Sequence, residues 1–217
     1  MIRSRGLGIC LLGFLILFVG CGSISKTTLK PGSQDDLPGC YAIFPAEPWE
    51  SVHRLEATIG GGYFSLLGIT QGQPSERRLQ SVLLTPEGFI LFDAELSRGG
   101  IAVRKAVDPF DSPAFARGLM EDVSLLFLPP QIKPKTWGKE LDGTTICKWE
   151  DPDQSHTEIT GSIESGWRIL RRDKYRRLIK QVFLNGPFFN GLASRMELRA
   201  FKPTPYRLRM TLVQPPP

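Results

Sequence analysis

The stretch from Leu79 to Phe92 is LQSVLLTPEGFILF, and this pattern predicts an antiparallel β-hairpin. Its middle, Thr85–Gly88, contains the proline and glycine that tight turns favour, with an apolar segment on each side. In the second segment, Ile90 and Phe92 fall on one face of the strand and Phe89 falls on the other. A strand with two apolar faces indicates that further structure packs over the sheet.

A single α-helix is expected to provide this covering layer. Ser112 suits the N-cap, Pro113 suits the first helical position, and Pro129-Pro130 prevents the helix from continuing. Between these limits, apolar residues recur at every fourth position on one face: Phe115, Leu119, Val123 and Phe127. Polar residues are expected on the solvent side of the helix: Arg117, Glu121 and Asp122.

The remaining apolar residues show the period of two that is typical of strands with one buried face. The pattern is clearest near the C-terminus, where Met196 and Leu198 alternate with Arg195, Glu197 and Arg199. Glu–Arg pairs across neighbouring strands are expected on the outer face, each contributing a few tenths of a kcal/mol. About nine to eleven strands can be recognised in this way. The pattern predicts an α+β fold that is mainly β, with an antiparallel sheet and a covering helix.

The first 21 residues predict an export signal that ends in a lipidated cysteine. Arg3 and Arg5 precede an apolar segment, Gly6–Val19, that is too short to remain as a membrane-spanning helix. The following Phe18-Val19-Gly20-Cys21 resembles the lipobox of bacterial lipoproteins, with Phe18 where leucine is usual. In that motif the cysteine receives a diacylglycerol with fatty acids such as palmitate, and it becomes the new N-terminus. The alternatives are an uncleaved anchor or an ordinary secretory signal.

Three segments are expected along the chain. Residues 1–20 form the signal peptide, and residues 21–36 form a polar tether that spans roughly 20 Å as a coil. Residues 37–217 then form one domain, because no later stretch has the composition of a linker.

Two cysteines remain in the domain, Cys40 and Cys147, and an oxidising compartment would favour a disulfide between them. The bond would close a loop of about 107 residues, for which the chain-entropy model gives about 4–5 kcal/mol of stabilisation. The alternative is two separate buried thiols.

Composition and motifs give no support for catalysis, metal binding or a cofactor. The two histidines, His53 and His156, have no nearby set of partners, and Gly161–Gly166 does not fit the nucleophile elbow of hydrolases. The chain has 27 basic and 22 acidic residues. Such a mild excess does not indicate a nucleic-acid partner. We therefore expect a protein that is not an enzyme.

A basic cluster lies between residues 168 and 180, with Trp167 and Tyr175 interleaved. Its cations are Arg168, Arg171, Arg172, Lys174, Arg176, Arg177 and Lys180. It could form a patch that meets anionic headgroups, at up to about 1 kcal/mol per charge. The alternative is a hairpin, turning near Arg172-Asp173, whose solvent face is basic.

The order of elements from Leu55 to Leu128, with the hairpin at Leu79–Phe92, resembles the LolA/LolB-type envelope proteins. The resemblance implies an open β half-barrel with helices on its concave side, where acyl chains of lipids or lipoproteins are sheltered. The residues that could line such a cavity are Leu66, Phe92, Trp137, Trp149, Trp167, Met196, Leu198, Leu208 and Met210. The alternative is that these side chains fill an ordinary core without a cavity.

The sequence thus predicts an envelope lipoprotein that binds or transfers a lipid or lipoprotein acyl chain. Gly22 follows the lipobox cysteine where an inner-membrane protein of enteric bacteria tends to have aspartate, which favours the outer membrane, facing the periplasm. The expected partners are the membrane, through the N-terminal lipid, and the acyl cargo. The alternative function is a non-catalytic assembly or scaffold lipoprotein with a solid core and an envelope protein as partner.

Overall fold

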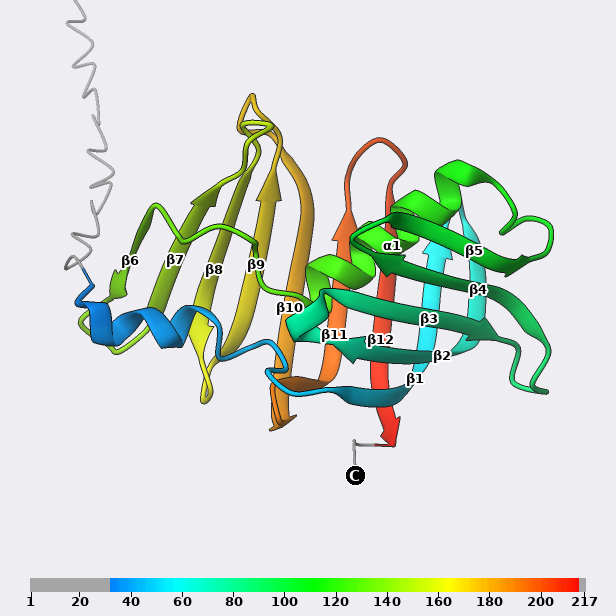
Figure 1. Ribbon diagram of the computed structural model, residues 1–217, viewed down its shortest axis with the longest axis horizontal. Helices are drawn as coiled ribbons and strands as arrows, with labels where there is room; N and C mark the ends of the chain where they lie inside the picture. Colours follow the sequence, from blue (N-terminus) through cyan, green and yellow to red (C-terminus); the bar gives the residue numbers. More distant parts are fainter. Residues whose placement is uncertain (1–31, 215–217) are drawn as a thin grey trace, which may run out of the picture.

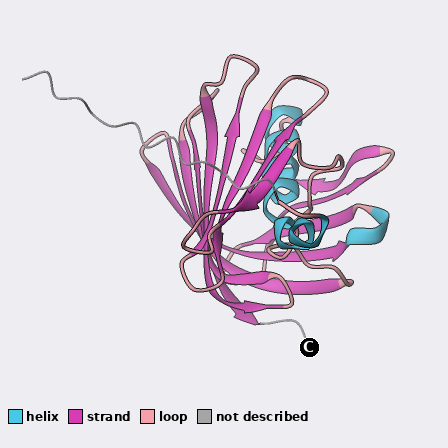
Figure 2. Cartoon of the chain, turned by 90° about the vertical axis from the view of Figure 1, so that its left-hand side faces the viewer, coloured by secondary structure: helices cyan, strands magenta, loops and turns pink. Residues whose placement is uncertain are grey.

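The computed structural model describes residues 32–214, in which one antiparallel sheet of twelve strands curves around a single α-helix (Figures 1 and 2). The strand order is β5-β4-β3-β2-β1-β12-β11-β10-β9-β8-β7-β6. The first and last strands of the described residues, β1 and β12, pair with each other, and α1 connects the two outer edges of the sheet. The strands are β1 (Trp49–Ile59), β2 (Gly62–Gln73), β3 (Arg78–Leu84), β4 (Ile90–Ser97), β5 (Gly100–Ala106), β6 (Thr136–Lys139), β7 (Thr145–Glu150), β8 (His156–Ser162), β9 (Gly166–Arg172), β10 (Leu178–Phe189), β11 (Leu192–Ala200) and β12 (Tyr206–Gln214).

The fold class is confirmed, because the sheet is antiparallel, open and covered by a helix. The sheet has twelve strands, more than the sequence pattern predicted. The short β6 was among the hardest to recognise, because its four residues offer too few alternating positions.

The predicted hairpin is formed by β3 and β4. Its turn is closed by the Thr85 N–H, which donates to the Phe89 carbonyl at 2.9 Å, and Gly88 adopts a φ of +93° that favours glycine. Phe92 is fully buried towards the helix. The opposite face is not covered as predicted, since Phe89 is 72% exposed at the end of the turn.

Helix α1 (Pro113–Phe127) begins and ends where the sequence predicted. The Ser112 hydroxyl accepts a hydrogen bond from the Phe115 N–H at 3.1 Å, which is the expected N-cap. Its apolar face packs on the sheet, with the ring of Phe115 edge-on to that of Phe92 at 5.4 Å between centroids. The prediction that Asp122 faces solvent is wrong, because only 3% of this residue is exposed.

The N-terminal segment (residues 32–48) crosses one end of strands β6–β9 and includes a 3₁₀ helix, η1 (Gln34–Cys40), shown in blue in Figure 1. The Gly32 N–H donates to the Trp137 carbonyl at 2.8 Å, and the Trp137 indole donates to the Ser33 carbonyl at 3.0 Å. The structure thus differs from the expected boundary at residue 37, because residues 32–36 already contact the sheet. The signal peptide and Cys21 lie outside the described residues.

A disulfide joins Cys40 of this segment to Cys147 of β7, with a Cα–Cα distance of 5.8 Å. Both cysteines are fully buried. The bond fastens the N-terminal segment to the concave side of the sheet.

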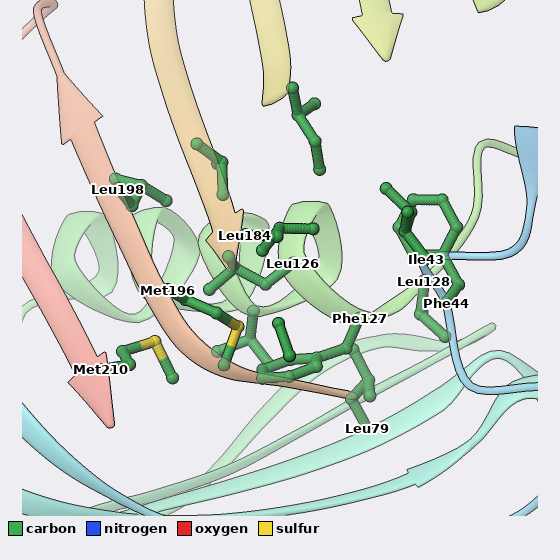
Figure 3. Packing of buried hydrophobic residues seen from close by; sticks show 14 of the residues in the cluster. Ile43, Phe44, Leu79, Leu126, Phe127, Leu128, Leu184, Met196, Leu198 and Met210 are labelled. Carbon is green, nitrogen blue, oxygen red and sulfur yellow. The ribbon is translucent and has the colours of Figure 1, made fainter. Parts of the chain in front are cut away.

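The core lies between α1 and the concave face of the sheet. Figure 3 shows the helix residues Leu126 and Phe127 against side chains from both halves of the sheet and from the N-terminal segment. A second 3₁₀ turn, η2 (Pro74–Glu76), connects β2 to β3. All of these elements and the core lie within residues 32–214. No helix among the described residues is long and apolar enough to cross a membrane.

Candidate functional site

The principal candidate site is a cavity of about 820 Å³ between the C-terminal half of α1, the loop 128–132 and strands β8–β10. We call it the α1 cavity. Its volume is within the range of about 300–1,000 Å³ that is common for small-molecule sites. Its floor is apolar, formed by Met120, Ile159 and Ile169, which are at most 1% exposed. Further apolar residues complete the wall: Phe44, Leu96, Ile101, Leu125, Leu128, Ile132 and Ile179.

Charged side chains lie among the lining residues of the α1 cavity. Lys180 binds Asp122 at 2.6 Å, and Arg171 binds Asp151 and donates to the Thr157 hydroxyl at 2.6 Å. The cavity therefore combines an apolar floor with charged side chains, of which Lys180 and Arg171 are ion-paired. Arg98 and Lys174 also line it and form no ion pair among the described residues. Such a site suits a molecule that has a long apolar part and a polar end.

A second hollow of about 1,240 Å³ lies beside the N-terminal segment, and we call it the N-terminal groove. Its lining combines apolar residues such as Trp49 with polar ones such as Glu47, Gln71 and Arg78. Only two of its apolar residues, Phe44 and Trp49, belong to the buried core. The α1 cavity reaches further into the core between helix and sheet, through Met120, Ile159 and Ile169, and it has more charged lining residues than the groove.

The side chains predicted to line an acyl site lie on the concave face of the sheet, but none of them lines the α1 cavity or the N-terminal groove. The indole of Trp149 is covered by the Tyr41 ring at 6.3 Å and donates to the Ile132 carbonyl at 3.0 Å. Six of the nine are packed in the buried core: Phe92, Trp149, Trp167, Met196, Leu198 and Met210. The other three are half-buried against that core: Leu66, Trp137 and Leu208. An acyl-lining role for these residues stays a prediction that would need α1 or the N-terminal segment to move.

The basic cluster of residues 168–180 does not form one patch. Arg171, Lys174 and Lys180 line the α1 cavity, whereas Arg168 is exposed on the opposite face of β9. The rest surround the β9–β10 turn, where Asp173 binds Arg177 at 2.7 Å. The interleaved Tyr175 lies under the cations Lys174 and Arg177, each 5.1 Å from its ring centroid, and Arg172 and Arg176 complete the turn.

A buried polar cluster that sequence reasoning missed ties α1 to the sheet. The Asp122 carboxylate binds Lys180 of β10 and accepts a hydrogen bond from the Tyr206 hydroxyl of β12. Burial raises the pKa of Asp122, and Lys180 and Tyr206 oppose this shift; burial also raises the pKa of Tyr206. The signal was present in the sequence, because Asp122 is three residues after Leu119 and four before Leu126, on the apolar stripe.

His53 is fully buried on β1, beneath the Phe127 ring at 5.9 Å between centroids. Its Nδ1 lies 3.4 Å from the Ser51 hydroxyl, and burial lowers its pKa to about 4. The neutral ring therefore belongs to the core. His156 is half-buried at the start of β8, and the described residues contain no group of three or more His, Cys, Asp or Glu side chains that could hold a metal ion.

Acid is expected to destabilise the protein through His53. Because its folded-state pKa of about 4 is below the ordinary value of 6.5, its stabilising contribution is present above pH 6.5 and is lost as the pH falls towards 4. Between pH 7 and pH 4.5 we expect a loss of about 2 kcal/mol from this residue. This loss is measured by urea unfolding of the wild type and of His53→Gln at both pH values. An equal pH dependence in the two proteins would contradict this assignment.

Comparison with known structures finds three similar proteins, all at low sequence identity. A LolA superfamily protein from Nitrosomonas europaea superposes with a TM-score of 0.54 and 8% identity, covering 85% of this chain and 93% of that one. A DUF1329 family protein from Desulfovibrio piger gives a TM-score of 0.44 and 10% identity, with 83% and 89% coverage. A domain described as an outer membrane lipoprotein-sorting protein, from Vibrio parahaemolyticus, gives 0.41 and 6%, with 83% and 89% coverage.

No protein-family model matches the sequence, and no curated protein matches it significantly. The match to the Nitrosomonas protein extends over most of both chains. It also agrees with the curved antiparallel sheet and the helix inside it. The chain therefore has a LolA/LolB-like fold.

Proposed function

We propose that the protein binds an acyl chain of a lipid or lipoprotein in the α1 cavity. The observation that carries this proposal is the apolar floor of Met120, Ile159 and Ile169 between the helix and the sheet. Exposing an acyl chain to water costs roughly 0.8 kcal/mol per CH₂ group, so a carrier must offer a dry surface of matching length. The LolA/LolB-like fold supports the same function, since the resemblance implies a sheltered acyl chain on the concave side.

We further propose that the protein is an envelope lipoprotein, anchored by a lipid on Cys21, with its folded domain in the periplasm and its anchor in the outer membrane. The motif Phe18-Val19-Gly20-Cys21 and the following Gly22 support this location. The disulfide between Cys40 and Cys147 also supports it, because such bonds persist in oxidising compartments. Mass spectrometry of the protein from a membrane fraction tests it, since an unmodified Cys21 would contradict the anchor.

A second candidate function is a scaffold or assembly lipoprotein without acyl cargo. The dense packing beneath the first half of α1 favours it, because Phe92 and Phe115 fill the space there. In this case the α1 cavity would contain only water, and an envelope protein would be the partner.

Placing a charge in the α1 cavity distinguishes these two functions. Leu125 is half-buried and lines the cavity, so Leu125→Arg would put a guanidinium where the acyl chain is expected. Leu119→Arg is the matched control, because Leu119 is a half-buried leucine of the same helix that does not line the cavity. We expect Leu125→Arg to weaken binding of a fluorescent fatty acid at least about tenfold, because several CH₂ groups lose their dry contact.

The measurement uses the chain that begins at Gly22, which contains every described residue. Fluorescence titration gives the dissociation constant, and native mass spectrometry of the protein from an envelope fraction identifies any retained lipid. Equal binding by both leucine variants would place the acyl chain elsewhere. No binding by the wild type, with no retained lipid, would reject the carrier function and favour the scaffold.

A further inference from the structure

The convex face of the sheet concentrates arginines that the proposed acyl site does not use. Six of them project from β1, β9, β11 and β12, on the side away from α1, and we call this surface the arginine face: Arg54, Arg168, Arg195, Arg199, Arg207 and Arg209. Within it lie two acidic residues, Glu56 and Glu197. Six arginines and two glutamates give this face a net charge of +4, whereas the whole 217-residue sequence has a net charge of +5.

Strand register explains why these residues gather. Glu197 of β11 faces Arg209 of β12, which in turn faces Glu56 of β1, while Arg199 faces Arg207 in the next row. Neighbouring strands are about 4.8 Å apart, and side chains on one face repeat about every 6.8 Å along a strand. The arginines therefore form a regular array across a broad surface.

The array is pre-ordered around a single carboxylate. Glu197 binds Arg199 at 2.5 Å, Arg207 at 2.6 Å and Arg209 at 3.4 Å. Its partial burial would raise its pKa, but Arg207 and Arg199 outweigh this and lower the pKa to about 2. One negative charge is thus shared by three guanidiniums, whose side chains stay 40–54% exposed and keep free N–H donors.

The three remaining arginines form no ion pair within the part of the chain that the structure describes. Arg54, Arg168 and Arg195 are exposed at the margins of the array, next to neutral residues such as Thr211 and Phe183. Their charges are available to an outside partner.

We propose that the arginine face docks on an anionic phospholipid surface. A guanidinium matches the oxygens of a phosphate, and an array of them matches a layer of headgroups. A protein partner is less well supported, because protein interfaces are centred on buried apolar anchors and the centre of this face is Glu197 with its arginines. None of the six arginines lines the α1 cavity or the N-terminal groove, so a small ligand has no enclosing site here.

Docking through this face would leave α1 and its cavity directed away from the headgroups, because they lie on the concave side of the sheet (Figure 2). The proposal is independent of the acyl function, since it uses the opposite face.

The test removes only the unpaired arginines, so that no carboxylate is left without a partner. The triple variant Arg54→Gln, Arg168→Gln and Arg195→Gln is compared with a matched triple variant on other surfaces, Lys105→Gln, Arg117→Gln and Lys133→Gln. Both variants lose three exposed cations. The chain that begins at Gly22 is mixed with vesicles of phosphatidylcholine, with or without phosphatidylglycerol, and the bound fraction is measured by co-sedimentation.

We expect binding only to vesicles with phosphatidylglycerol, with a partition coefficient at least about tenfold lower for the arginine-face variant. The matched variant should change by less than about threefold, and salt should release the wild type, because the attraction is screened. Equal losses in the two variants, or no binding by the wild type, would overturn the proposal. Retention on a soluble polyanion such as heparin without vesicle binding would also overturn it and would indicate a polymeric partner. Circular dichroism and fatty-acid binding should be unchanged in both variants.

Discussion

Replacing Lys180 with methionine is expected to lower the free energy of unfolding by about 3–5 kcal/mol, because it leaves the buried Asp122 carboxylate without its cation. The side chains of Asp122 and Lys180 are only 5% and 13% exposed, so the carboxylate stays largely shielded from bulk water when its partner is removed. The remaining hydrogen bond from Tyr206 compensates only in part. Urea unfolding at pH 7 measures the loss, with the m-value showing whether the transition stays two-state.

The control is the double variant Asp122→Asn with Lys180→Met, which removes both charges. It should be more stable than Lys180→Met alone, because no uncompensated charge remains. A double variant no more stable than the single one would show that the ion pair is not the cause.

The stability of Lys180→Met should depend on pH in the opposite sense to the contribution of His53. Burial raises the pKa of Asp122, and loss of Lys180 removes an interaction that opposes this shift. An acid whose folded-state pKa is raised binds a proton more readily in the folded state, so stability falls as the pH rises through that range. Acidification should therefore restore part of the stability that Lys180→Met loses at pH 7.

Removing the disulfide is expected to cost about 4–5 kcal/mol, because the bond closes a long loop in the unfolded chain. Cys40 and Cys147 are 107 residues apart and fully buried, so the variant with alanine at both positions also leaves a small cavity where the two sulfur atoms were. Guanidinium unfolding of the oxidised wild type and of this variant gives the difference.

A reducing agent provides the matched comparison. It should lower the stability of the wild type towards that of the double alanine variant and should leave the variant unchanged. A wild type that is equally stable with and without the reductant, while its thiols are titrated as free, would contradict a stabilising disulfide.

Local patterns in the sequence were sufficient for the hairpin and for α1. The turn at Thr85–Gly88 and the limits set by Ser112 and Pro129 depend on residues close in sequence, and the structure has these elements in place. The division of the basic cluster could also have been foreseen. Arg168 and Arg171 are an odd number of residues apart on one strand, so they must point to opposite faces.

The α1 cavity could not be foreseen in the same way. Its lining comes from elements as far apart in sequence as Phe44 and Lys180. The residues chosen from the sequence were on the concave face, as an alternating pattern can show, but the pattern contains no information on what covers them. Phe92 is covered by Phe115 of α1, whereas Ile159 and Ile169 border the cavity.

The sequence by itself determined that strands alternate apolar and charged residues, that one capped helix covers them and that two cysteines remain in the domain. The tertiary structure alone decided that β1 pairs with β12, that Asp122 is buried against Lys180 and that six arginines share the convex face. The physical reason is that periodicity fixes which face a side chain takes within its own strand or helix, whereas burial and charge pairing depend on neighbours that only the register and curvature of the whole sheet bring together.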